Sequence, residues 1–155
     1  MPIETFNVEF PVSEIELVYK SKVKASERLR VTKSQEVYAL FNSIWDKNRI
    51  EFVEEFKVAF LNQSNSVLGV CSLSSGGLTG TVADIRIVFG AALKINACAI
   101  TICHNHPSGN LKPSRVDEDI TRLFIEAGKI LNIRLVDHLI ITNEGYYSFA
   151  DEGAF

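Results

Sequence analysis

The sequence predicts an α/β fold of the α+β kind, in which helices cover both faces of a mixed β-sheet. Segments with helical spacing of apolar residues and segments typical of strands intermix along the 155 residues without strict alternation. At roughly 100–200 residues per domain, such a chain is expected to form one domain. Its composition, 46% hydrophobic and 23% charged, is that of a globular protein and excludes a disordered chain.

An arm is expected at the N-terminus, over residues 1–33, and the main domain is expected to follow over residues 34–155. Apolar side chains alternate with polar ones from Ile15 to Tyr19. This alternation predicts a first strand, half-buried and ending near Lys24. The arm and the domain are expected to pack as one unit.

The domain is expected to contain three helices and five strands. Apolar residues at helical spacing predict helices over residues 34–47, over residues 82–94 and from Ser114 onward. Alternating or short continuous apolar runs predict strands over residues 54–62, 67–73, 97–103, 133–142 and 146–149. The third helix is expected to face inward with Val116, Ile120, Leu123, Phe124, Ala127 and Ile130.

The loop over residues 74–81 is rich in glycine but lacks the lysine of a phosphate-binding loop and does not fit the dinucleotide-binding pattern. It is interpreted as the lead into the second helix, with Thr81 and Asp84 as a capping pair.

The net charge of −3 excludes a generally cationic nucleic-acid-binding protein. Residues 20–33 depart from this average, because they hold six basic residues and one acidic residue, a local balance of +5. This segment is expected to be a solvated connection, with weak DNA contact as the alternative. The six basic residues are Lys20, Lys22, Lys24, Arg28, Arg30 and Lys33.

No apolar run approaches the ~18 residues that a membrane-spanning helix requires. The first twenty residues carry four glutamates and no continuous apolar segment, so no signal peptide is expected. The three cysteines are odd in number and lie in apolar stretches. They are interpreted as buried free thiols of a reducing compartment, which predicts a cytoplasmic protein without membrane contact.

Two of the three histidines, His104 and His106, directly follow the strand at 97–103. Residues two apart in an extended chain point the same way, so the two imidazoles are expected to meet. Asp117 lies eleven residues beyond His106, in the first turn of the next helix, and the loop between can bring its carboxylate to the same point. Two imidazoles and one carboxylate suit catalytic zinc, with a fourth position open for water.

Such a metal site needs a base and a group that stabilises an oxyanion. Glu54 and Glu55 head a predicted strand, and alternation places them on opposite faces, so only one can reach the metal. Ser114 can stabilise an oxyanion or cap the helix that carries Asp117, and its spacing to Asp117 fits both uses. His138, in a later strand, is interpreted as a structural residue.

These residues resemble the JAB/JAMM (MPN+) metalloprotease family. The signature of that family is an upstream glutamate, then H-x-H, seven residues, serine, two residues and aspartate. His104, His106, Ser114 and Asp117 fit this spacing without a gap. The resemblance implies a cytidine-deaminase-like JAB/MPN architecture.

The sequence from His104, HNHPSG, resembles the RadC branch of the family, historically labelled a DNA-repair protein. The branch's E-x-F-x-V-x-x-L-[DN] strand places the family's glutamate on Glu54, and the resemblance covers roughly residues 34–155. Two features depart from it. The chain is expected to lack the N-terminal helix-hairpin-helix domain of full-length RadC proteins, and Asp84 to Ile87 stand where the family usually shows Pro-Arg-Glu.

The resemblance implies a zinc-dependent metallopeptidase or other amide (isopeptide) hydrolase, with one zinc per chain on His104, His106 and Asp117. Glu54 would accept a proton from the metal-bound water and pass it to the leaving amine, while zinc and Ser114 stabilise the oxyanion. The implied partner is a peptide or protein substrate.

Asn105, Pro107 and Ser108 are interpreted as shaping the loop around the ligands. The alternative functions are a DNA-repair-associated accessory protein or metal-dependent nuclease, and a non-catalytic scaffold. The intact ligand set argues against the scaffold.

Overall fold

The computed structural model describes residues 10–13, 15, 16, 18–75 and 83–155. One sheet of five strands runs through them in the order β2-β1-β3-β4-β5. Its only parallel pair is β3 with β4, so the described sheet is mixed, as predicted. The strands are β1 (Glu55–Leu61), β2 (Val67–Ser75), β3 (Ala99–Asn105), β4 (Arg134–Ile141) and β5 (Tyr146–Ser148).

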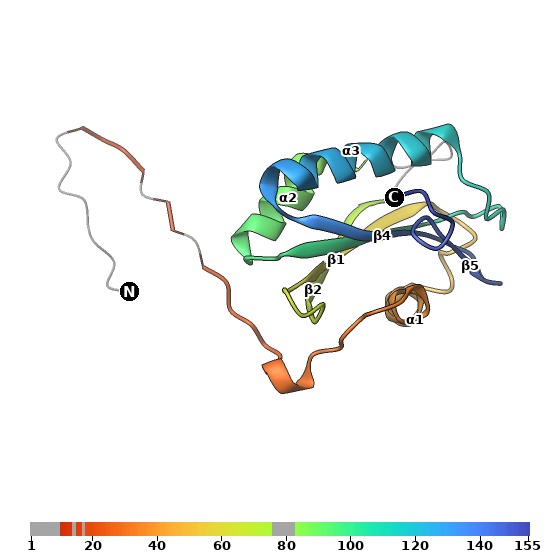
Figure 1. Cartoon of the computed structure of the whole chain (residues 1–155), viewed down its shortest axis with the longest axis horizontal. Coiled ribbons are helices and arrows are strands. Elements are labelled where there is room, and N and C mark those ends of the chain that lie inside the picture. The colour runs from red at the N-terminus through yellow and green to blue at the C-terminus, as the bar shows by residue number, and fades with distance from the viewer. Residues whose placement is uncertain (1–9, 14, 17, 76–82) are drawn as a thin grey trace.

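Helices lie on both faces of this sheet (Figure 1). They are α1 (Ser34–Ile44), α2 (Ile85–Lys94) and α3 (Arg115–Leu131), and a short 3-10 turn, η1 (Ala25–Glu27), precedes them. α2 and α3 pack on the face to which β1 presents Phe56 and Phe60, while α1 packs on the face that carries Ala59 and Leu61. The three-layer α/β architecture predicted from the sequence is therefore confirmed.

β3 and β4 are joined by α3, whose two ends are both defined by local chemistry. Ser114 caps the N-terminus in a capping box with Asp117. At the other end Asn132 takes the left-handed conformation, with φ of 55°. A Cβ on Gly128 would lie 2.2 Å from the carbonyl oxygen of Ile133. Glycine at this position therefore lets the chain turn closely from α3 into β4.

The predicted inward face of α3 is partly wrong. Val116 and Ile130 are 62% and 85% exposed, and Leu123 is also exposed. Phe124 is buried as predicted, but its buried companions on the helix are Asp117, Thr121 and Gly128. Ile120 and Ala127 do pack against the core as predicted. Asp117 and Thr121 are buried because they meet His104 in β3 and His138 in β4, which a pattern of apolar residues does not reveal. Leu93 in α2 and Ile44 in α1, which belong to the helical apolar patterns of those segments, are exposed as well.

The strand predicted in the N-terminal arm is also wrong. The described residues between 15 and 24 form no strand, and Ile15 is 86% exposed. Alternating apolar residues need a sheet to cover one side. The arm meets the free edge of β2 through the bridge of Arg30 with Ser66 and through the Tyr19 hydroxyl, which donates to the Leu68 carbonyl at 3.0 Å. Neither contact continues into a strand.

Most of the loop predicted over residues 74–81, including Thr81, lies outside the described residues. Asp84 does cap α2, since its carboxylate accepts a hydrogen bond from the Arg86 amide at 2.9 Å. The three cysteines are free, with Cys103 buried and the other two half-buried. Among the described residues, no helix is both long and apolar enough to cross a membrane.

Candidate metal centre

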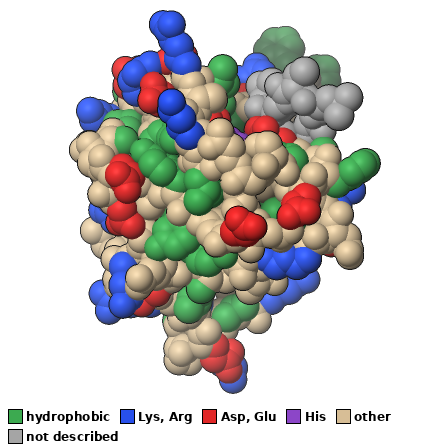
Figure 2. All heavy atoms as spheres, turned by 90° about the vertical axis from the view of Figure 1, so that its right-hand side faces the viewer, with side chains coloured by type: hydrophobic (Ala, Val, Ile, Leu, Met, Phe, Trp, Pro, Cys, Tyr) green, Lys and Arg blue, Asp and Glu red, His purple; other side chains and the backbone are tan. Residues whose placement is uncertain are grey.

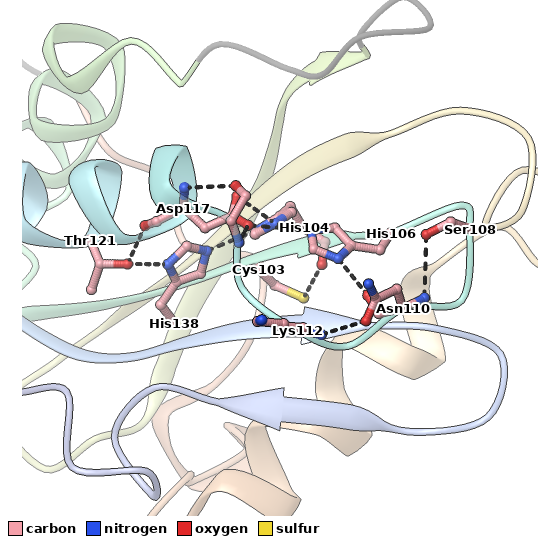
Figure 3. Close-up of polar contacts among 10 residues, drawn as sticks. Cys103, His104, His106, Ser108, Asn110, Lys112, Asp117, Thr121 and His138 are labelled. Carbon is pink, nitrogen blue, oxygen red and sulfur yellow. Dashed lines mark hydrogen bonds and ion pairs between the residues drawn. The ribbon is translucent and has the colours of Figure 1, made fainter.

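The structure brings together the three side chains predicted to hold a metal. One ligand atom each from His104, His106 and Asp117 lies within 4.8 Å of the others. The two Nε2 atoms are 3.0 Å apart. Asp117 places Oδ1 3.1 Å from the Nε2 of His104 and Oδ2 3.4 Å from that of His106 (Figure 3). The loop after β3 thus folds back onto α3 as predicted.

These separations fit a small tetrahedral ion. Bonds of 2.0–2.1 Å to a tetrahedral zinc place neighbouring ligand atoms about 3.3 Å apart. The Nδ1 atom of His106 lies 2.6 Å from the carbonyl oxygen of Asn110, which can only accept, so Nδ1 donates and, in the neutral ring, Nε2 carries the lone pair. A nitrogen lone pair and a carboxylate that face one point attract a cation, and the group can therefore hold a metal.

Local structure explains how Asp117 reaches this point. Ser114 Oγ accepts a hydrogen bond from the Asp117 amide at 3.2 Å, and the Asp117 carboxylate accepts one from the Ser114 amide at 2.7 Å. The capping box therefore orients the ligand carboxylate. Accepting this bond uses a lone pair of Oγ and leaves the hydroxyl hydrogen free of the cap, so capping does not prevent Ser114 from donating to a substrate.

The two glutamates at the head of β1 are separated as alternation predicts. Glu55 is bound by Arg49, whose Nε lies 3.1 Å away, with Lys57 Nζ at 3.9 Å. The pKa of His106 is raised mainly by its hydrogen bond with Asp117, and the negative charge of Glu54 adds to this shift. Of the two carboxylates, Glu54 is thus the one whose charge acts on His106.

Comparison with known proteins agrees with this geometry. The family model for the RadC-like JAB domain matches residues 31–154, which include every residue of the candidate metal centre. The chain belongs to the RadC-like JAB domain family.

Three bacterial relatives show how far the similarity extends. A UPF0758 protein of Flavobacterium johnsoniae is 52% identical over 102 residues, 66% of this chain and 44% of the relative. One of Syntrophotalea carbinolica is 39% identical over 124 residues, 80% of this chain and 53% of the relative. UPF0758 protein YfjY of Escherichia coli is 40% identical over 100 residues, 64% of this chain and 62% of the relative. The chain thus spans about half the length of these curated relatives.

In this RadC-like domain, Asn105 ties the segment before β1 to the end of β3. Its amide nitrogen donates to the carbonyl oxygens of Ile50 at 2.7 Å and Val53 at 2.9 Å, and its oxygen accepts from the Glu55 amide at 2.7 Å. Asn105 is fully buried. These three bonds hold the backbone next to Glu54 against the strand that carries His104.

Pro107 and Ser108 lie in the turn that follows His106. The Gly109 amide donates to the His106 carbonyl at 3.0 Å, and Ser108 Oγ accepts from the Asn110 amide at 3.3 Å. This turn presents the Asn110 carbonyl to the His106 ring (Figure 3).

Sequence reasoning did not connect two buried residues to the metal centre. His138, interpreted as structural, places Nε2 2.9 Å from the Nδ1 of His104. Thr121 places Oγ1 2.6 Å from the other ring nitrogen of His138. Thr121 lies one helical turn after Asp117, and this spacing was the signal available for it. Burial lowers the pKa of His138 well below its ordinary range, so the ring is neutral.

Asp117 is held as an anion. Burial alone would raise its pKa, but the hydrogen bonds with His104 and His106 outweigh burial and hold the pKa far below its ordinary value of 3.8. Asp117 is therefore available as a charged ligand at any physiological pH.

The ion pair between His106 and Asp117 is expected to stabilise the metal-free domain less as the pH rises above 6.5. The raised pKa of His106 contributes stability that is complete below its ordinary value of 6.5 and is lost as the pH rises through the raised value. The depressed pKa of Asp117 contributes stability above 3.8 that is lost only at far lower pH. Thermal melting of the chelated protein across roughly pH 5 to 8 checks this expectation.

The metal-loaded protein should instead gain stability as the pH rises, because protons compete with the metal for His106 at lower pH. The matched control is His106→Ala, because it keeps the contribution of buried His138, whose lowered pKa has the opposite effect and favours the fold as the pH rises. The advantage of the metal-free wild type over His106→Ala in melting temperature should therefore shrink as the pH rises above 6.5. A difference between the two proteins that does not change with pH would contradict the ion pair between His106 and Asp117.

Proposed function

We propose that this RadC-like domain is a zinc-dependent metallopeptidase, or another amide hydrolase that cleaves isopeptide bonds. The observation that carries the proposal is the convergence of two Nε2 atoms and one carboxylate beside Glu54. A structural zinc site takes four protein ligands, whereas the group found among the described residues offers three. Three protein ligands leave the fourth position of a tetrahedral zinc open for water or substrate, which suits catalysis.

Zinc bound by these residues would act as a Lewis acid and lower the pKa of a water molecule toward ~7. The protein would supply the proton transfers. Glu54 is placed to accept a proton and to donate it later to the leaving amine. The Ser114 hydroxyl can donate to the substrate oxygen as that oxygen gains charge.

A substrate would approach from the His106 side. His104 is only 2% exposed, while the side chain of His106 is 16% exposed. In Figure 2, a small area of histidine surface is visible beside acidic side chains. The protein therefore buries one ligand and leaves the other at the edge of the surface, which supports an accessible metal.

The proposal is tested by incubating the purified protein with a diverse mixture of peptides and isopeptides and detecting new amino termini by mass spectrometry. We expect cleavage by the zinc-loaded wild type that stops on chelation and is absent in His106→Ala. Cleavage that persists in the chelated protein, or no cleavage of any substrate by the zinc-loaded protein, would contradict the proposal.

A second proposal is that the arm contacts DNA, as an accessory or nuclease role would require. Its six basic residues are exposed or half-exposed on the segment that leads into α1 (Figure 1), and they are Lys20, Lys22, Lys24, Arg28, Arg30 and Lys33. Binding through phosphates would weaken steeply as salt increases. Absence of DNA binding at low salt would end this proposal.

A further inference from the structure

We infer that His138 and Thr121 form a hydrogen-bond chain with a single direction, which holds His104 in the tautomer that presents Nε2 to the metal. Both are positioning residues, since neither belongs to the converging ligand set. The inference rests on the metal site of the proposed function and not on the reaction.

The direction of the chain is set at Thr121. Its Oγ1 lies 2.7 Å from the carbonyl oxygen of Asp117 and 2.6 Å from the Nδ1 of His138 (Figure 3). A carbonyl oxygen can only accept, and a hydroxyl has one hydrogen to donate. Thr121 therefore donates to Asp117, and its oxygen accepts from Nδ1 of His138.

His138 connects Thr121 to the metal ligand His104, and the direction of its hydrogen bonds fixes the tautomer of His104. The ring is fully buried and stacks on Phe149 at 4.6 Å, an environment that favours a neutral imidazole. A neutral ring that donates through Nδ1 has an unprotonated Nε2. That atom lies 2.9 Å from the Nδ1 of His104 and accepts from it. His104 therefore keeps its proton on Nδ1 and can present the lone pair of Nε2 to the metal.

The chain also connects ligands that come from different elements. It starts at His104 in β3 and ends on the backbone carbonyl of Asp117 in α3. His106, in contrast, is oriented directly by the Asn110 carbonyl. Loss of such an outer partner typically lowers metal affinity by about 10- to 100-fold.

The affinity test uses Zn²⁺ alone, measured by competition with a chromogenic chelator. Thr121→Val removes the hydroxyl at nearly constant volume, and we expect its zinc affinity to fall by about 10- to 100-fold. Thr121→Ser keeps the hydroxyl and should bind nearly as tightly as the wild type. The matched control is Thr101→Val, because Thr101 is also buried and its hydroxyl donates to the backbone carbonyl of Asp137 at 3.2 Å, outside the chain that leads to His104.

A second readout needs no activity, and its first part needs no metal. Long-range proton–nitrogen NMR of the metal-free wild type should show His138 protonated on Nδ1 and not on Nε2. In the zinc-loaded protein, His104 should keep its Nδ1 proton. This readout uses only the wild type and therefore remains decisive if a variant fails to fold.

A proton on Nε2 of His138, or wild-type zinc affinity in a folded Thr121→Val, would overturn the inference. A protein that binds zinc with this tautomer pattern but cleaves no peptide would contradict the proposed reaction alone.

Discussion

Glu54→Gln should retain the zinc, but its rate of hydrolysis of any substrate should fall by a factor of about 10² to 10⁴. This is the usual contribution of a general acid–base residue. The amide has nearly the shape of the carboxylate but cannot accept a proton at neutral pH. The charge of Glu54 acts on His106, but Glu54 is not one of the three proposed metal ligands. Turnover and bound zinc measured on the same sample therefore separate a loss of catalysis from a loss of metal.

Glu55→Gln is the matched control, because the same chemical change occurs one residue further along β1. Glu55 is bound by Arg49 and Lys57 on the opposite face of the sheet, so its loss should reduce stability more than turnover. Full activity in Glu54→Gln, or loss of turnover in a folded Glu55→Gln, would show that the base has been assigned to the wrong glutamate.

His106→Ala should lose the metal altogether under conditions in which the wild type carries about one zinc ion per chain. The variant removes one of three converging ligand atoms and leaves a histidine and a carboxylate, too few for tight binding. Elemental analysis of the purified proteins after dialysis measures this directly.

Lys112→Ala is a suitable control for this variant. It lies in the same loop with an exposed side chain, and its backbone amide, which donates to Asn110 Oδ1 at 3.0 Å, is preserved. The control should keep its zinc. Stoichiometric zinc that survives in His106→Ala would place the metal elsewhere in the protein.

The ligand set could be predicted from the sequence because it depends on local geometry. His104 and His106 point the same way because the chain is extended there, and β3 continues through the first of them. Asp117 is brought in by a helix start that the spacing of Ser114 also predicts. The pairing of the two histidines and the orientation of Asp117 by Ser114 each involve neighbours within one strand or one turn, and the resemblance to the family supplied the link between them.

The residues that support the ligands depend on tertiary contacts, which a sequence pattern does not contain. His138 meets His104 only because β4 pairs in parallel with β3 in a particular register. Thr121 meets His138 only because α3 is rotated to bury polar residues, and the apolar stripe suggested a different face. Alternation alone did not choose between Glu54 and Glu55; the resemblance to the RadC branch chose Glu54, and the binding of Glu55 by Arg49 agrees with that choice.

The arm shows the opposite case, in which a clear alternation of apolar and polar residues does not form a strand. Alternation around Ile15 predicted a strand, but no neighbouring strand covers that residue in the described structure. A strand is stabilised by its neighbours in the sheet, and a period of two cannot supply them.

The zinc K-edge X-ray absorption spectrum of the purified protein tests the central claim most directly, because it reports the atoms around the metal. The arrangement of His104, His106 and Asp117 predicts four nitrogen or oxygen neighbours at about 2.0–2.1 Å, with the outer scattering of two imidazole rings. A sulfur neighbour at about 2.3 Å, or a spectrum without imidazole scattering, would contradict the assignment of this metal centre.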